Sequence, residues 1–223
     1  MIQQEAYETI KSAATAAKAV LVAVSKTKPA EDILALYALG QRDFGENYVQ
    51  ELAEKAPALP GDIRWHFIGH LQTNKVKTIA PFVHLIHGVE SFRLLQEINK
   101  QALKAGRIID VLLQVFIAEE ETKFGLDATE VFELLEYYEA QQASLQNIRI
   151  CGLMGMASNT SDAAVIQKEF HALRALFDNL RQVQFLGKAY FNALSMGMSG
   201  DYQMALAEGS TMLRIGSLLF GSR

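Results

Sequence analysis

Short apolar runs alternate along this chain with longer segments in which apolar residues recur at helical spacing. Several of the short runs are apolar throughout, which is typical of strands that are covered on both faces of a parallel sheet. We therefore predict eight strands, which occupy residues 20–25, 42–45, 64–69, 82–89, 109–117, 148–156, 190–197 and 211–221.

The segments between these runs carry the start and stop signals of helices. Residues 29–39 begin with a proline and have two acidic residues close behind it, which suits the first turn of a helix. In residues 162–182, Ser161 or Asp162 is a natural cap for the first turn. Further helices are predicted at residues 3–18, 46–56, 72–80, 91–104, 127–143 and 199–209.

Eight strand–helix steps in 223 residues predict an α/β fold, a single (β/α)8 TIM-like barrel with an extra N-terminal helix at 3–18. A doubly wound open sheet is the alternative that this pattern leaves open. The chain contains only four prolines and no low-complexity tract, so we expect residues 1–223 to form one domain.

Composition narrows the class of protein. The chain carries 21 basic and 25 acidic residues, and this net charge of −4 argues against broad electrostatic binding of nucleic acid. Cys151 is the single cysteine, which forbids an internal disulfide and fits a reducing compartment. The polar start and the lack of an apolar run near the roughly 20 residues of a membrane helix predict a cytoplasmic protein outside the membrane. The acidic run at 119–122 is interpreted as a solvated loop.

Candidate chemistry gathers where the predicted strands end, because the sites of such barrels lie at the carboxyl ends of the strands. Lys26 ends the first apolar run. It is either a solvated charge or, where burial lowers its pKa, a nucleophile toward an aldehyde. Lys28 is interpreted as the solvated lysine of the pair.

Two later segments form a candidate phosphate site. The stretch "LSMGMSGD" (194–201) places small residues and hydroxyls before a predicted helix, and "RIGS" (214–217) adds backbone N–H groups. Asp201 favours the alternative of an ordinary turn and helix cap, because a carboxylate repels phosphate.

A nucleophilic lysine together with a phosphate site points to a phosphorylated aldehyde. Pyridoxal 5′-phosphate (PLP) is the common one, and the substrate of a lysine-dependent aldolase is the rival case. A metal site is not expected, because His66 and His70 lie four residues apart but form no HExxH motif.

Six blocks, which follow one another over nearly the whole chain, resemble the pyridoxal phosphate homeostasis family of PLP-binding proteins. They are "AVSKTKP", "DFGENYVQE", "WHFIGHLQTNKVK", "GLMGMAS", "LSMGMSGD" and "GSTMLRIGSLLFGSR". That family is similar to the barrel domain of the bacterial alanine racemases, which are fold-type III PLP enzymes. The resemblance therefore implies a barrel that holds PLP as a Schiff base.

The resemblance also implies roles for individual residues around the cofactor ring. Lys26 in "AVSKTKP" matches the lysine that forms the Schiff base, and Asn47 in "GEN" lies in the block beside the cofactor. Arg214 in "RIGS" matches the arginine that faces the pyridine nitrogen in the racemase barrel.

Four more residues are implied on the phosphate side. Ser195 and Ser199 in "LSMGMS" match that side of the site, and Gly216 and Ser217 match the phosphate loop. The family often has threonine where this chain has Ser217, and the exchange keeps the hydroxyl.

Two points favour a protein that holds PLP without using it. An arginine that donates a hydrogen bond to the ring nitrogen leaves that nitrogen unprotonated, which weakens the electron sink that carbanion chemistry needs. The sequence ends at Arg223 directly after the eighth predicted strand. We therefore expect no counterpart of the β domain with which alanine racemases supply an acid/base tyrosine on the second face of the substrate.

These expectations describe an essentially non-catalytic, monomeric protein of intracellular PLP homeostasis, with apo-PLP enzymes as candidate recipients of the cofactor. Two alternatives stay open at this point. One is a single-domain, PLP-dependent amino-acid racemase-like enzyme, and the other is a lysine-dependent aldolase without PLP.

Overall fold

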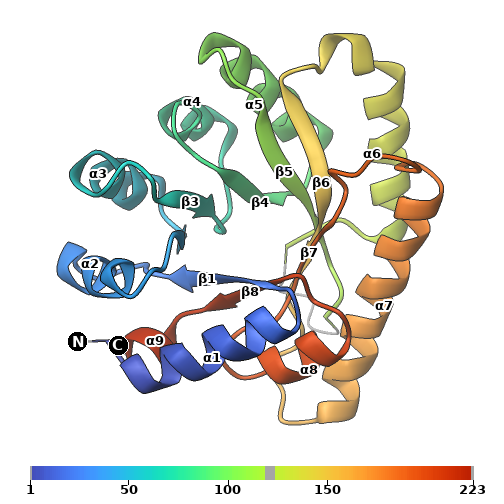
Figure 1. Cartoon of the computed structure of the whole chain (residues 1–223). Coiled ribbons are helices and arrows are strands. Elements are labelled where there is room, and N and C mark those ends of the chain that lie inside the picture. Colours follow the sequence, from blue (N-terminus) through green and yellow to red (C-terminus); the bar gives the residue numbers. More distant parts are fainter. Residues whose placement is uncertain (1, 119–123, 222–223) are drawn as a thin grey trace.

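The computed structural model describes residues 2–118 and 124–221. Within them, eight parallel strands pair in chain order, and β1 pairs with β8 to close a barrel (Figure 1). This closure confirms the (β/α)8 barrel and excludes the doubly wound open sheet. The strands are β1 Val20–Val24, β2 Asp43–Glu46, β3 Arg64–Phe67, β4 Leu85–Val89, β5 Ile109–Val115, β6 Ile148–Gly155, β7 Ala193–Ser195 and β8 Met212–Ile215.

Helices surround the outside of the barrel (Figure 1). The predicted extra helix precedes β1 as α1, and it buries Tyr7, Ile10 and Ala14 in the core. The N–H of Gln3 donates to the carbonyl of Leu219 at 2.8 Å, which ties the two ends of the described chain together. The helices are α1 Gln4–Ala16, α2 Ala30–Ala38, α3 Val49–Ala58, α4 Val76–Ile79, α5 Phe92–Lys104, α6 Ala128–Ala140, α7 Ala163–Gln182, α8 Tyr202–Ala207 and α9 Ser217–Phe220, with short 3-10 helices at Thr73–Lys75 and Gln142–Ser144.

The strands separate two apolar layers, because successive side chains of a strand point to opposite faces. In β1, Leu21 and Ala23 belong to the large core between sheet and helices, whereas Val22 packs in a smaller cluster with Leu112 and Met154. Val24 lies on the same face as Val22 but nearer the C-terminal end of the strand. That face of β1 therefore leads from the barrel interior to its C-terminal mouth.

The last predicted strand is longer than the structure allows. Residues 211–221 were expected to form one strand, but β8 ends at Ile215 and the chain continues as α9. Leu219 and Phe220 lie on α9 and are buried, so their apolar character is that of the packed face of a helix. The seventh strand is also shorter than predicted, because Phe191 stacks on Phe185 at 4.0 Å between ring centres before the strand begins.

Two further expectations concern the rest of the chain. Among the described helices, none combines the length and the apolar character that crossing a lipid bilayer requires. The acidic run at 119–122, which the sequence predicts to be a solvated loop, lies outside the described residues.

Candidate functional site

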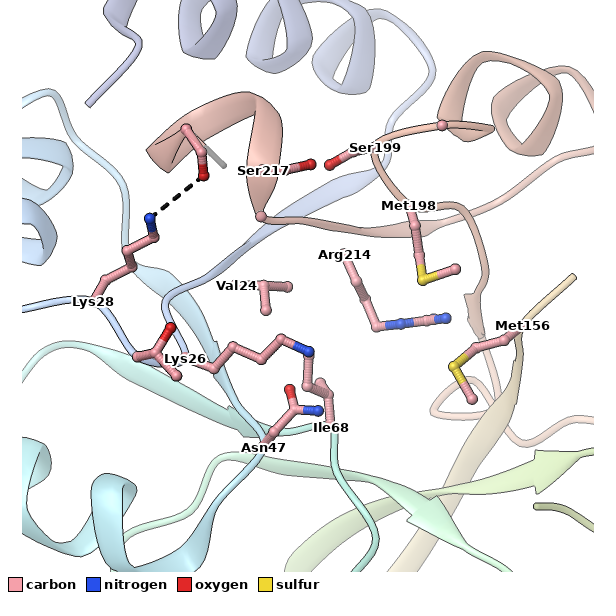
Figure 2. A pocket seen from close by; sticks show the side chains of 14 residues that line it. Val24, Lys26, Lys28, Asn47, Ile68, Met156, Met198, Ser199, Arg214 and Ser217 are labelled. Carbon is pink, nitrogen blue, oxygen red and sulfur yellow. Dashed lines mark hydrogen bonds between the residues drawn. The ribbon is translucent and has the colours of Figure 1, made fainter. Parts of the chain in front are cut away.

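A cavity of about 370 Å³ opens at the C-terminal mouth of the barrel. Figure 2 shows Lys26 and Arg214 extending into it, while the hydroxyls of Ser199 and Ser217 face one another at one side. The volume is that of a typical small-molecule pocket. Six of the seven residues predicted for the site line this cavity: Lys26, Asn47, Ser199, Arg214, Gly216 and Ser217.

Lys26 reaches the cavity because it continues the inward face of β1, two residues beyond Val24. The next residue, Thr27, has a φ of +62°, a left-handed conformation that turns the chain sharply. Its N–H donates to Oε1 of Glu51 at 2.5 Å, which holds that turn. The strand pattern thus carries Lys26 into the cavity, and the turn places Thr27 and Lys28 at its border.

Lys28 is not the solvated lysine that the sequence predicts. Its Nζ donates to the carbonyl of Phe220 at 3.0 Å and to that of Gly221 at 3.4 Å (Figure 2). A lysine that satisfies carbonyls at a helix C-terminus stabilises that end. Lys28 therefore joins the loop after β1 to α9, although it also borders the cavity.

A buried ionic cluster, which the sequence did not predict, holds the loop that follows β1. Lys55 donates to the carbonyl of Ser25 at 2.8 Å, to Glu46 at 2.8 Å and to Glu51 at 2.6 Å. The Ser25 hydroxyl also donates to Glu46 at 2.6 Å. The available sequence signal was the i, i+4 spacing of Glu51 and Lys55 on α3, but nothing in the sequence places Glu46 beside them.

Asn47 lies at the end of β2 on the wall of the cavity. Its Oδ1 atom is buried and accepts no hydrogen bond from any other described residue. A Cβ added to Gly69 would lie 2.2 Å from the Asn47 carbonyl oxygen, so a glycine is required there for the backbones to approach. The close packing fixes Asn47, and its orphaned oxygen remains an acceptor for a bound ligand.

The segment that carries Ser199 depends on a glycine turn. Gly197 has a φ of +96°, and a Cβ there would lie 2.6 Å from the Cβ of Ala205 on α8. Asp201 accepts a hydrogen bond from the N–H of Met198 at 2.5 Å, so its carboxylate closes the turn. Asp201 stands at the N-terminal end of α8 but makes no side-chain capping hydrogen bond to it, so the structure confirms the turn and not the helix cap. Ser199 still lines the cavity.

Arg214 is 5% exposed, and two of its N–H groups are held by protein atoms. Nη1 donates to the Ser195 hydroxyl at 2.7 Å, and Nη2 donates to the carbonyl of Gly155 at 2.9 Å. Burial lowers the pKa of Arg214 to about 10, and the negative charge of Asp201 opposes that shift. The guanidinium is therefore still protonated at neutral pH, with further donors to offer the cavity.

Ser195 is the predicted site residue that the structure places elsewhere. It does not line the cavity, and its side chain is fully buried behind Arg214. Its Oγ lies 3.0 Å from Nδ1 of His87 and accepts from Arg214. At the end of β7 its side chain points toward His87 and Arg214 inside the barrel.

Two histidines and an aspartate continue this contact into the barrel. His87 Nε2 lies 2.9 Å from His66 Nδ1, and His66 Nε2 lies 3.1 Å from Asp43 Oδ1. Burial lowers the pKa of His87 well below its ordinary value, and the neighbouring His66, Arg214 and His84 lower it further. His87 is consequently neutral at physiological pH.

The depressed pKa of His87 predicts an acid-dependent loss of stability. Below about pH 6.5 the unfolded chain protonates this histidine while the folded protein does not, so stability falls as the pH falls. Between pH 6.5 and 5, we expect the free energy of unfolding of the wild type to fall more steeply than that of His87→Gln, by up to about 1.4 kcal/mol per pH unit. Urea unfolding across this range measures it, with His171→Gln as the control, because the side chain of His171 is 75% exposed. An unchanged slope in His87→Gln would contradict the assignment.

His66 and His70, which the sequence paired only to discount a metal site, have different partners. His66 contacts Asp43 and His87 inside the barrel. His70 Nδ1 lies 2.9 Å from Oε1 of Glu90, and its side chain is 49% exposed. Among the described residues, no group of three or more histidine, cysteine or acidic side chains could hold a metal ion.

Comparisons with known proteins agree with this geometry. The sequence profile of the alanine racemase N-terminal domain matches residues 4–223. A protein of Aquifex aeolicus named pyridoxal phosphate homeostasis protein is 41% identical over 204 residues, covering 91% of this chain and 86% of its own. The human protein of the same name is 38% identical, covering 91% of this chain and 76% of its own.

Solved structures give the same relationship. PipY of Synechococcus elongatus without PLP superposes with a TM-score of 0.87 at 36% identity, covering 97% of this chain and 99% of its own. The structure of PipY with PLP bound has a TM-score of 0.79 and covers 92% and 93% of the two chains. Alanine racemase of Bartonella henselae shares the fold at 16% identity, with a TM-score of 0.67 over 95% of this chain and 56% of its own. The resemblance read from the six sequence blocks is thereby confirmed, and the chain belongs to the pyridoxal phosphate homeostasis protein family, on a barrel of the alanine racemase N-terminal type.

Proposed function

We propose that this protein binds PLP covalently through Lys26 at the barrel mouth and keeps the cytoplasmic supply of the cofactor in balance without turning over a substrate at ordinary enzyme rates. The observation that carries the proposal is the meeting of Lys26 and Arg214 in one cavity that serine hydroxyls also line. The names of the relatives and the PLP-bound structure of PipY support it.

The chemistry of the cavity fits PLP. It offers an amine for the aldehyde in Lys26 and hydroxyls for the phosphate in Ser199 and Ser217. Gly216 lines the cavity beside Ser217. Asn47 contributes a buried oxygen that accepts from no other described residue, which suits a polar substituent of a ring.

Each of these residues then has a task. Lys26 anchors the cofactor, and Ser199, Gly216 and Ser217 bind its phosphate. Arg214 would donate a hydrogen bond to the ring nitrogen, which would then carry no proton. When bound, PLP supplies an electrophilic aldehyde and an electron sink, and an unprotonated ring nitrogen weakens that sink.

The walls of the cavity favour retention over catalysis. Among the described lining residues, the ionisable ones are Lys26, Lys28 and Arg214, and Lys28 is engaged by the carbonyls of α9. Met156 and Met198 form part of the lining, and a thioether carries no proton to transfer. A two-base racemase needs an acid/base group on each face of its substrate. We therefore propose that the cavity retains PLP without racemase activity, and we add the proposal that the protein is a monomer and hands PLP to apo-PLP enzymes.

Two measurements test this proposal. PLP-loaded protein mixed with a panel of amino acids in D2O is expected to show no exchange of the α-proton beyond that caused by free PLP. Exchange at ordinary enzyme rates that disappears in Lys26→Ala would instead establish the racemase-like alternative. Transfer of PLP to an apo-enzyme is expected to outpace its spontaneous dissociation, and equal rates would remove the delivery role.

A further inference from the structure

A continuous line of buried side chains runs from the cavity through the inside of the barrel to the N-terminal ends of β2 and β3. Its four successive contacts measure 2.7, 3.0, 2.9 and 3.1 Å. Every member is at most 5% exposed, so these contacts are shielded from solvent. The line consists of Arg214, Ser195, His87, His66 and Asp43, which come from five different strands.

The carboxylate end fixes the direction of the hydrogen bonds when both histidines are neutral. Asp43 only accepts, so His66 donates to it from Nε2 and accepts at Nδ1 from the Nε2–H of His87. Nδ1 of His87 is then an acceptor for the Ser195 hydroxyl, whose oxygen accepts from Arg214.

This arrangement satisfies every contact with both histidines neutral. An extra proton on His87 would make Nδ1 a donor, so the Ser195 hydroxyl would have to accept from both His87 and Arg214 and turn its own proton elsewhere. It would also put a second buried cation close to the guanidinium, and burial without a paired charge is costly. The positive charge of Arg214 therefore favours a neutral His87 that accepts from the Ser195 hydroxyl.

Other ionisable groups face the line from the surrounding elements. Arg64 donates to Asp43 from Nε at 2.7 Å, and the His84 ring stands edge-on to His66 at 5.4 Å. Burial raises the pKa of Asp43, but hydrogen bonds from His66 and Arg64 outweigh that effect and hold the pKa below its ordinary value. Asp43 is therefore a stable carboxylate anchor at the far end.

We propose that Asp43, His66, His87 and Ser195 are positioning residues for Arg214. The carboxylate at the N-terminal end of the barrel sets the direction of the hydrogen bonds, which keeps Ser195 an acceptor and Arg214 a fixed donor at the cavity. This inference rests on the proposed function in one step, namely that Arg214 meets the ring nitrogen of PLP.

The first test uses protein without cofactor, so it is independent of the proposed function. Nitrogen-15 NMR of the histidine rings is expected to show His66 and His87 as pure Nε2–H tautomers across neutral pH. In Asp43→Ala both histidines are expected to become mixtures of tautomers, because the anchoring acceptor is gone. Unchanged tautomers in this variant, or Nδ1–H forms in the wild type, would overturn the proposal.

Asp110→Ala is a matched control for Asp43→Ala. Asp110 also accepts two hydrogen bonds from an arginine of the neighbouring strand, Arg149, at 2.7 and 3.0 Å. Within residues 2–118 and 124–221, no hydrogen bond joins Asp110 to a histidine ring, whereas Asp43 has one to His66. Loss of the pure tautomers in both variants would show a general effect of weakening the strand ends and would contradict a specific role of Asp43.

The second test reads the cavity itself and does not require Asp43→Ala to fold. Ser195→Ala interrupts the line directly behind Arg214. In the PLP-loaded protein, the pH at which the absorption of the bound cofactor changes is expected to shift by about one unit. Asp110→Ala is expected to leave this pH unchanged. The same pH in Ser195→Ala and wild type would refute the positioning role, whereas failure of the wild type to bind PLP would refute the proposed function and leave the tautomer result standing.

Discussion

Replacing Lys26 with alanine is expected to abolish covalent retention of PLP, whereas replacing Lys28 with alanine is expected to leave the covalent adduct in place. Both lysines border the same cavity, so each alanine variant removes one positive charge from it. A difference between the two variants therefore reports the position of the attacking amine and not the loss of charge. Lys26 follows the inward face of β1 into the cavity, while the Nζ of Lys28 is held by the carbonyls of Phe220 and Gly221. An amine that is already donating to backbone carbonyls at the end of a helix is poorly placed to attack an aldehyde.

Borohydride reduction of PLP-loaded protein, followed by intact mass and peptide mapping, measures this difference. Wild type and Lys28→Ala are expected to carry one phosphopyridoxyl group on Lys26, and Lys26→Ala is expected to carry none. Recovery of the group on Lys28 in the wild type would reverse the assignment of the two lysines. A wild type that is never labelled would instead leave the aldolase interpretation as the better one.

The barrel and most of the cavity lining could be predicted because they are local consequences of strand periodicity. The apolar run at 20–25 predicts a covered strand, and strand alternation carries Val24 and Lys26 to the same face. The segments that contribute Ser199 and Gly216 are also short and continuous, so their motifs remain recognisable in the sequence. These features need no knowledge of which other strand lies nearby.

The interior line and the buried ionic cluster depend on contacts between distant segments, for which the sequence signals little beyond the i, i+4 spacing of Glu51 and Lys55. The resemblance assigned Ser195 to the phosphate side, whereas its side chain contacts His87, 108 residues away in the sequence. Likewise the apolar residues of α9 resemble a continuing strand, because burial on a helix and in a sheet demands the same residue types. The spacing of apolar residues predicts which side chains are buried. The closure of the barrel determines which of them are in contact.

Replacing Lys55 with methionine is expected to give a large loss of stability, because it leaves a buried carboxylate without its cation. The side chain of Glu46 is 0% exposed and that of Lys55 is 11% exposed, so solvent screens this pair little. Removing one partner of a buried ion pair costs about 3–5 kcal/mol. Urea unfolding at pH 7 measures the loss, and Lys100→Met is the control. Lys100 is 60% exposed and lies 3.5 Å from Glu97, and such surface pairs contribute between about 0 and 1 kcal/mol.

The pH dependence distinguishes this cause from lost packing. Burial raises the pKa of Glu46 above its ordinary value, while Lys55 and Ser25 oppose that shift. Without Lys55 the pKa rises further, so the deficit is largest well above the folded pKa and shrinks as acid neutralises the carboxyl. Adding Glu46→Gln to Lys55→Met is expected to recover most of the stability at pH 7. A deficit that stays constant with pH and persists in the double variant would show that the hydrogen bond from Lys55 to the Ser25 carbonyl, and not the pairing with Glu46, supports the loop that carries Lys26.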